Sequence, residues 1–162
     1  MRTFGIGLLL TLVAGVVAAQ GPAPQTPKTY TSAAEITAMM AKAKAERKPD
    51  QANLIQTILR LAPYSANLEY RGAVGPAAVH EKEAEFFYVI DGSATLVTGG
   101  KLVDEKRTNA ANLSGTAIDG GTKQPIAKGD FLVVPEGTPH WFSPVNGTLV
   151  LMSLHVPRPN AK

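Results

Sequence analysis

The chain of 162 residues contains no cysteine. Disulfide bonds, thiolate metal ligands and thiol nucleophiles are therefore excluded, and a bound metal would be held through nitrogen and oxygen atoms. The sequence also lacks a basic stripe with interleaved aromatic residues, so we expect no nucleic-acid partner. A hydrophobic content of 44% with 18% charged residues predicts a globular chain with a buried core.

The first 19 residues have the pattern of an export signal. Arg2 precedes an apolar run from Phe4 to Val17, and small residues stand directly before Gln20. The run is shorter than the about 20 apolar residues that span a membrane. We therefore predict a signal peptide over residues 1–19, cleavage, and a periplasmic or secreted protein that is not attached to a membrane afterwards. The alternative is an uncleaved anchor.

The remaining chain divides into three parts. Residues 20–30 are rich in Pro, Gly and Gln without periodicity, which indicates a flexible leader. A helix is predicted over residues 31–49, because Ser32 and Glu35 have the spacing of a capping box and apolar residues follow at helical intervals up to Pro49. Residues 50–158 consist of short β-branched and aromatic runs separated by Gly, Pro and Asn, which is typical of an all-β barrel or sandwich.

We predict strands over residues 53–62, 65–71, 77–82, 85–90, 93–98, 124–127, 131–134 and 148–156. Asp91-Gly92 is a hairpin signal between two of them. The segment 103–122 is long for a connection and rich in Asn, Gly, Thr and Ser. It is either a surface insertion or a lid over a cavity.

The candidate chemistry lies in two stretches. Residues 80–92 read HEKEAEFFYVIDG, and residues 129–140 read GDFLVVPEGTPH. Strand alternation places His80 and Lys82 on one face, and it groups Glu85 with Phe87 and Val89. Since the opposite face of that strand is apolar too, we expect a second sheet, the helix or a dimer partner to cover it.

These residues resemble the cupin superfamily. Gly129, Pro135, Gly137 and His140 fit the second cupin motif, and Glu85 and Gly92 fit part of the first. The usual His-x-His of the first motif is here His80-Glu81-Lys82. The resemblance extends over residues 53–157 and implies an antiparallel jelly-roll β-barrel with one N-terminal helix.

The resemblance further implies a divalent metal, Fe, Mn, Ni or Zn, with His80, Glu85 and His140 as ligands and Lys82 in the place of the missing histidine. A divalent ion about 6 Å from an ammonium group is repelled by roughly 5 kcal/mol at an effective dielectric constant near 20. Lys82 therefore separates two hypotheses. Either it is neutral or turned away from a bound metal, or it pairs with Glu85 and no metal binds.

The first hypothesis is an exported protein that binds a small molecule at the metal. If it is an enzyme, the resemblance implies an isomerase, oxygenase or lyase, with Lys82 as a catalytic acid or base. The second is a metal-free binding module that is dimeric through its outer apolar strand. A homodimer is expected in either case, and a purely structural protein would leave the motif histidines without a role.

Three further residues could lie at the cavity. His155 shares a strand face with Leu151 and Ser153, but a lone histidine near a strand end is more often a surface or structural residue. Trp141 is interpreted as a packing or rim residue, and Arg71 as a charge at a strand edge.

Overall fold

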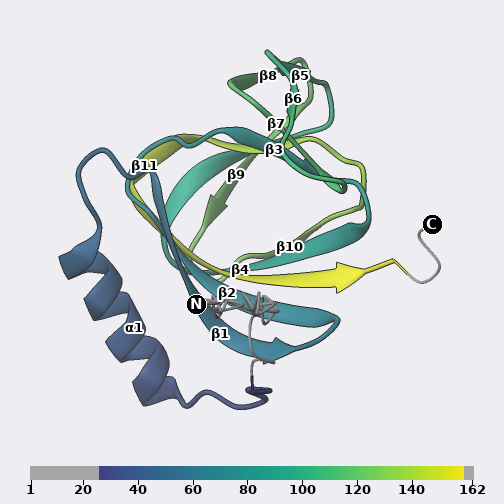
Figure 1. The fold of residues 1–162 in the computed structure, drawn as a ribbon. Helices are drawn as coiled ribbons and strands as arrows, with labels where there is room; N and C mark the ends of the chain where they lie inside the picture. The colour runs from purple at the N-terminus through teal and green to yellow at the C-terminus, as the bar shows by residue number, and fades with distance from the viewer. Residues whose placement is uncertain (1–25, 159–162) are drawn as a thin grey trace, which may run out of the picture.

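A computed structural model of the chain describes residues 26–158. The predicted signal peptide and half of the predicted leader lie outside these residues. Within them the chain forms one helix and eleven strands (Figure 1). The elements are α1 Ala33–Glu46, β1 Asn53–Leu61, β2 Tyr64–Arg71, β3 Ala77–His80, β4 Glu83–Thr98, β5 Lys101–Val103, β6 Lys106–Arg107, β7 Asn112–Gly115, β8 Ala117–Asp119, β9 Thr122–Ala127, β10 Phe131–Val134 and β11 His140–Pro157.

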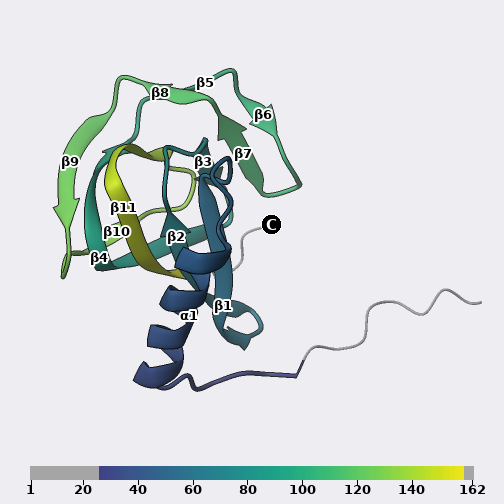
Figure 2. The same ribbon diagram turned by 90° about the vertical axis from the view of Figure 1, so that its left-hand side faces the viewer.

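Two long antiparallel strands form the frame of the barrel. β4 and β11 pair from Glu83 opposite Pro157 to Thr98 opposite His140, with register shifts on the way. β2 and β1 continue the sheet beyond β11, while β9 and β10 pair with the other edge of β4. The strands curve round into a jelly-roll β-barrel with α1 on its outside (Figures 1 and 2), so the predicted fold class is confirmed.

The core has two parts, one on each face of this sheet. Inside the barrel, alternate residues of β4 and β11 are fully buried, including Phe87, Val89 and Leu151. Outside, α1 packs over β1 and β2, where Ala43 and Leu68 are fully buried.

The capping box that begins α1 is formed as the sequence predicts. The Glu35 N–H donates to Ser32 Oγ over 3.2 Å, and the Ser32 N–H donates to Glu35 Oε2 over 2.7 Å. The capping box thereby fixes the N-terminal end of the helix.

Two predicted strand boundaries lie within longer strands. Asp91-Gly92 is not a hairpin, because β4 continues through it to Thr98. Gly92 has a φ of +82°, and a Cβ there would collide with the carbonyl of Thr148 on β11. Glycine is thus required by the close approach of two strands. β11 likewise begins at His140 rather than at Thr148, because its register shifts accommodate Pro144 and Gly147.

The segment 103–122 is not an extended loop. It contains parts of β5 to β8, which form a lobe at one end of the barrel (Figure 1). β7 pairs with β3 and sets Asn112 opposite His80, so the lobe contributes to the site described below. No helix within residues 26–158 is long and apolar enough to cross a membrane.

Candidate metal centre

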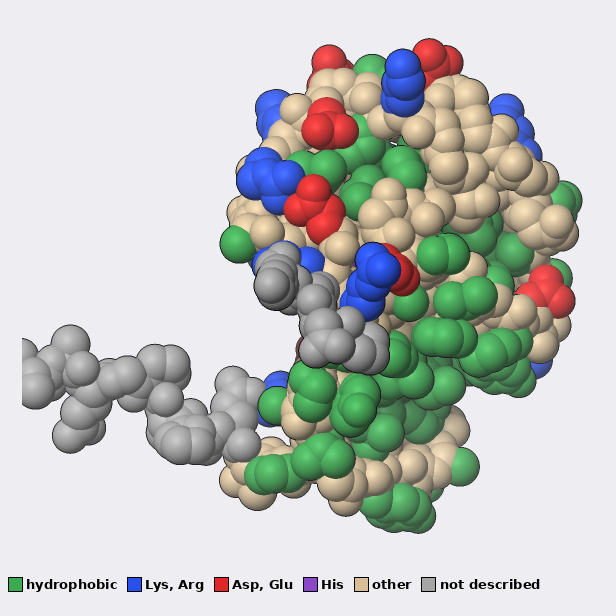
Figure 3. Space-filling model, turned by 90° about the vertical axis from the view of Figure 1, so that its right-hand side faces the viewer, with side chains coloured by type: hydrophobic (Ala, Val, Ile, Leu, Met, Phe, Trp, Pro, Cys, Tyr) green, Lys and Arg blue, Asp and Glu red, His purple; other side chains and the backbone are tan. Residues whose placement is uncertain are grey.

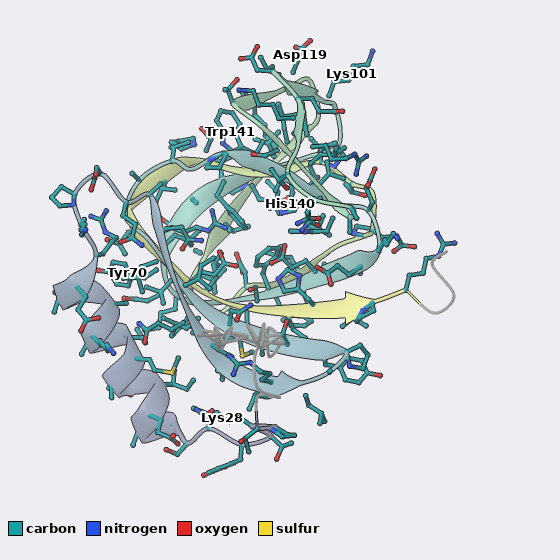
Figure 4. The ribbon with its side chains drawn as sticks, viewed as in Figure 1. Lys28, Tyr70, Lys101, Asp119, His140 and Trp141 are labelled. Atoms are coloured by element: carbon teal, nitrogen blue, oxygen red, sulfur yellow. The ribbon has the colours of Figure 1, made fainter. Side chains whose placement is uncertain are left out.

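Three imidazole rings meet at the carboxylate of Glu85 inside the barrel. The Nε2 atoms of His80 and His140 each lie 3.3 Å from Glu85 Oε2, and His155 Nε2 lies 3.1 Å from Glu85 Oε1. The chain has three histidines, and all of them are in this cluster. His140 lies within the ring of strands in Figure 4.

Strand pairing explains why these residues meet. Glu85 lies directly opposite His155 in the β4 and β11 ladder, and both face the barrel interior. His140 begins β11 at the point where that strand crosses Ala78 of β3, two residues before His80. A side chain on an antiparallel strand lies about 5 Å from the one opposite it, so the two ends of β11 deliver one imidazole each to the same carboxylate.

Each imidazole also has an oxygen acceptor on its outer side. His80 Nδ1 lies 2.9 Å from Asn112 Oδ1, His140 Nδ1 lies 3.4 Å from the Thr138 carbonyl, and His155 Nδ1 lies 2.8 Å from Glu83 Oε1. An acceptor at Nδ1 holds the proton on that nitrogen. The inward Nε2 atoms are then the ones that can bind a metal.

Interactions within the cluster shift the pKa values of Glu85, His80 and His155. Burial favours a higher pKa for the Glu85 carboxyl, but hydrogen bonds from His140, His155 and His80 outweigh it and hold this pKa far below its usual range. Burial favours a lower pKa for His155, yet the hydrogen bond and charge of Glu85, together with Glu83, raise it to about 9. The pKa of His80 is raised in the same way by Glu85 and Asn112, against the effect of burial.

Lys82 does not lie where the sequence placed it. The predicted strand 77–82 ends at His80, a bend follows at residues 81 and 82, and Lys82 is exposed to solvent. No ion pair joins Lys82 to Glu85 in the described part of the chain, and the carboxylate is surrounded by imidazoles instead. The expectation that Lys82 lines the cavity is therefore corrected.

His155, interpreted from the sequence as a surface or structural residue, is a member of the cluster. The sequence pattern that could have indicated this is strand alternation, because His155 shares a strand face with Leu151 and Ser153, and both of these are buried in the barrel. Sequence reasoning also missed the roles of Glu83 and Asn112. β4 begins at Glu83, so this residue shares the inward face with Glu85, whereas the contact of Asn112 depends on the pairing of β7 with β3.

The other two candidates have structural contacts. The Trp141 Nε1–H donates to the Gly75 carbonyl over 2.8 Å. Arg71 is half-buried, pairs with Glu69 and lies 4.6 Å above the ring of Phe142. None of these contacts involves an imidazole of the cluster.

Comparison with known proteins agrees with this geometry. The sequence profile of the family described as Cupin matches residues 48–161. The chain belongs to the cupin family. A search of curated proteins gives no match for this cupin.

Solved structures share its fold. KdgF from a Halomonas species has a TM-score of 0.50 and 18% identity, over 70% of this chain and 86% of that one. Iron(II) HppE has a TM-score of 0.51 and 15% identity, over 68% of this chain and 54% of that one, so this cupin spans about half the length of HppE. Hydroquinone 1,2-dioxygenase PnpCD, solved with Cd2+ and 4-hydroxybenzonitrile, has a TM-score of 0.54 and 15% identity, over 74% of this chain and 72% of that one. At these identities the similarity shows the fold alone.

The donor set of this cupin fits a divalent transition metal. Three imidazole nitrogens and one carboxylate oxygen suit Fe, Mn, Ni or Zn, and the ligand atoms of His80, Glu85 and His155 lie within 4.8 Å of one another. The outer acceptors supply the orientation that ligating histidines need. His80, Glu85 and His155 thus form a group of three possible ligands despite the lysine at position 82, and His140 Nε2 lies 3.3 Å from the same carboxylate.

Proposed function

We propose that this chain is an exported cupin that binds a small molecule at a divalent metal held by His80, Glu85, His140 and His155. The observation that carries the proposal is the convergence of three Nε2 atoms on one buried carboxylate, each imidazole being held from outside by an oxygen. Export is supported by the signal pattern at residues 1–19.

The exposed side of the cluster indicates where a ligand enters. The side chains of His80 and His155 are 19% and 17% exposed, whereas those of His140 and Glu85 are 5% and 4% exposed. A small molecule would therefore reach the metal past His80 and His155. When bound, the metal would polarise a carboxylate or hydroxyl group of that molecule. Glu83, beside His155, would hold the ring in place while the ligand exchanges.

The metal-free alternative has less support. It requires a Lys82–Glu85 pair in place of the metal, and Lys82 is exposed while Glu85 contacts the imidazoles. Without metal, protonated His80 and His155, whose pKa values are raised, would balance the charge of Glu85 in place of Lys82.

Metal content tests the proposal. We expect about one transition-metal ion per chain, measured by mass spectrometry on freshly purified protein that has never been exposed to a chelator. His140→Ala removes an inward ligand and should abolish retention, while Lys82→Ala, an exposed control, should keep it. Metal-free wild-type protein that also fails to bind added Zn2+ or Co2+ would refute the function.

Ligand binding needs its own measurement. The visible absorption of the Co2+-loaded protein reports on the coordination of the ion, so small hydroxy and carboxylic acids that bind the metal should change it. A spectrum that no such acid alters, in protein with full cobalt occupancy, would contradict the small-molecule part of the proposal while leaving the metal site intact.

A further inference from the structure

The lobe of residues 101–119 forms a groove against the barrel. Figure 2 shows the lobe arching over the end of the barrel at which β3 lies. A cavity of about 500 Å³, the lobe groove, opens between the lobe and the segment that precedes β3. None of its described lining residues belongs to the cluster around Glu85. Small-molecule sites usually have volumes of about 300–1,000 Å³, so the lobe groove can hold a ligand of its own.

Strand pairing determines which side chains of the lobe reach the groove. Lys106 of β6 lies opposite Ser114 of β7, and Ser114 lies opposite Ala78 of β3. Residues directly opposite on antiparallel strands share a face, so Lys106 and Ser114 project to the same side. Arg107, the next residue, projects to the other side, where it forms an ion pair with Glu81 over 2.7 Å. Lys106 is therefore the basic residue that the lobe presents to the groove.

The walls of the lobe groove are fixed by contacts within the protein. On one wall the Trp141 Nε1–H donates to the Gly75 carbonyl over 2.8 Å. On the other wall a Cβ added at Gly115 would lie 2.7 Å from a carbonyl oxygen of β5, so β5 packs directly against β7. Asp104 has a φ of +50°, which aspartate tolerates, and its Oδ2 accepts from Thr116 Oγ1 over 2.8 Å. A preformed groove of this kind loses little conformational entropy when a ligand binds.

The polar groups of the lobe groove are mostly hydrogen-bond acceptors. Its three hydroxyl side chains each donate their proton to a protein oxygen 2.8–3.2 Å away; they are Thr108, Ser114 and Thr116. A hydroxyl group has one proton and two lone pairs, so these oxygens remain available as acceptors. The Asp104 carboxylate adds a charged acceptor, and Lys106 supplies the charged donor among the described lining residues. The groove therefore suits a ligand with several donors and one anionic group.

The charges of the lobe are balanced. Residues 101–119 include three basic and three acidic residues. In Figure 3 acidic and basic side chains are interspersed over the upper part of the molecule, whereas hydrophobic side chains gather over the lower part. Asp104 and Lys106 both line the groove, and the ion pairs within residues 26–158 include no contact between them. Separate charges of opposite sign are complementary to a zwitterion, whereas Asp104 would repel a polyanion.

The barrel side of the lobe groove is apolar. Val74 and Pro76 form it, and the Val74 side chain is 43% exposed. An apolar wall beside a few polar groups is typical of a small-molecule site, in which the wall contacts the body of the ligand and the polar groups fix its orientation. A ligand that covers Val74 removes apolar surface from water, which favours binding.

We propose that the lobe groove binds an amino acid or a dipeptide with apolar side chains. The ammonium group of the ligand donates to Asp104 and to the hydroxyl oxygens, the carboxylate accepts from Lys106, and the side chain packs on Val74 and Pro76. An ammonium group has three donors, which matches the excess of acceptors in the groove. Binding does not require a metal, so this site is independent of the metal centre.

NMR titration of the metal-free mature chain tests the site. Metal is removed first, because amino acids chelate transition metals and would otherwise also bind at the imidazole cluster. We expect L-leucine or L-leucyl-L-leucine to shift the amide signals of Gly75, Gly115 and Thr116 and to leave that of His155 unchanged. Inorganic phosphate should shift none of them. The proposal is overturned if neither ligand shifts these signals at millimolar concentration, or if phosphate shifts them equally.

Charge variants test the orientation of the ligand. Lys106→Met should weaken L-leucine binding about five- to tenfold, the effect of losing one charged contact in a partly exposed groove, and should leave L-leucinamide, which lacks the carboxylate, unaffected. Asp104→Asn should weaken L-leucine binding similarly and leave N-acetyl-L-leucine, which lacks the ammonium group, unaffected. Lys101→Met and Asp119→Asn are the controls, because both residues lie at the tip of the lobe outside the groove (Figure 4).

Two results would contradict the orientation or the site. Groove variants that bind L-leucine as tightly as the control variants overturn the proposal. Binding of L-leucine that appears only after Zn2+ is added, and that Lys106→Met leaves intact, places the ligand on the metal. That result also overturns the lobe groove as a site, while it agrees with the function proposed for the metal centre.

Discussion

Glu83 is the residue whose substitution tests the metal centre most directly. Its Oε1 lies 2.8 Å from His155 Nδ1 and 3.9 Å from His80 Nδ1. In Glu83→Gln the side chain keeps its length and can still accept a hydrogen bond, but the negative charge is lost. The ligand atoms themselves are unchanged, so any effect on metal binding must act through the orientation and basicity of His155.

The expected loss of metal affinity is about 10- to 100-fold, which is the usual effect of removing an outer partner of a ligating histidine. The effect on folding should be small, because the Glu83 side chain is 29% exposed and partly screened by water. We expect the free energy of unfolding of the metal-free protein to fall by about 1 kcal/mol at most, the scale of one hydrogen bond.

Glu136 supplies a matched control. Its side chain is 31% exposed and pairs with Arg158 at 3.4 Å without touching an imidazole. Zn2+ affinity would be measured for wild type, Glu83→Gln and Glu136→Gln by competition with a chromophoric chelator. Only Glu83→Gln should weaken binding. Equal affinities for the two glutamine variants would refute the role of Glu83 as the partner of His155.

Four further results are expected. Zn2+ affinity should rise about tenfold per pH unit between pH 6.5 and about 9, because the metal displaces a proton from His155, whose pKa is raised to about 9; a competition titration with no slope there would contradict this. Without metal, protonated His155 stabilises the fold fully below pH 6.5, and this stabilisation should be lost as the pH rises through about 9 in urea titrations. Lys82→His should leave Zn2+ affinity within about threefold, because the residue is exposed in a bend; a large gain would show that position 82 reaches the site. Phe87→Ala, at a fully buried position packed edge-on against Phe142, should lower the free energy of unfolding by about 3–5 kcal/mol in urea, and a loss below about 1 kcal/mol would place Phe87 outside the core.

The fold could be predicted from local signals wherever these agree with the long-range packing. The capping box at Ser32 is formed in the structure. The predicted alternation of Glu85, Phe87 and Val89 is also present, because the face of β4 that carries these three residues is buried in the barrel. Gly92 was interpreted as a turn from its local chemistry. Its actual constraint comes from Thr148, more than fifty residues away in sequence, which no local pattern reveals.

Position 82 illustrates a limit of motif spacing. The spacing of the first cupin motif places a ligand at Lys82 only if the strand that contains His80 continues to that residue. Here β3 ends at His80, a bend follows, and β4 begins at Glu83. The interruption reverses which side chains face inward, so Glu83 replaces Lys82 beside the cluster. A single-residue change in phase moves every following side chain to the opposite face.

The strand that pairs with β4 then explains how another imidazole reaches the carboxylate of Glu85. Glu85 has an inward neighbour on β11 at the directly opposite position, and that position holds His155. An imidazole at position 155 reaches the carboxylate as readily as the motif histidine expected at position 82 would, because cross-strand neighbours lie about 5 Å apart. The third imidazole is therefore specified by strand pairing rather than by spacing within one motif. In a cupin that lacks one motif histidine, the position across the ladder from the motif glutamate is where a replacement ligand can be expected.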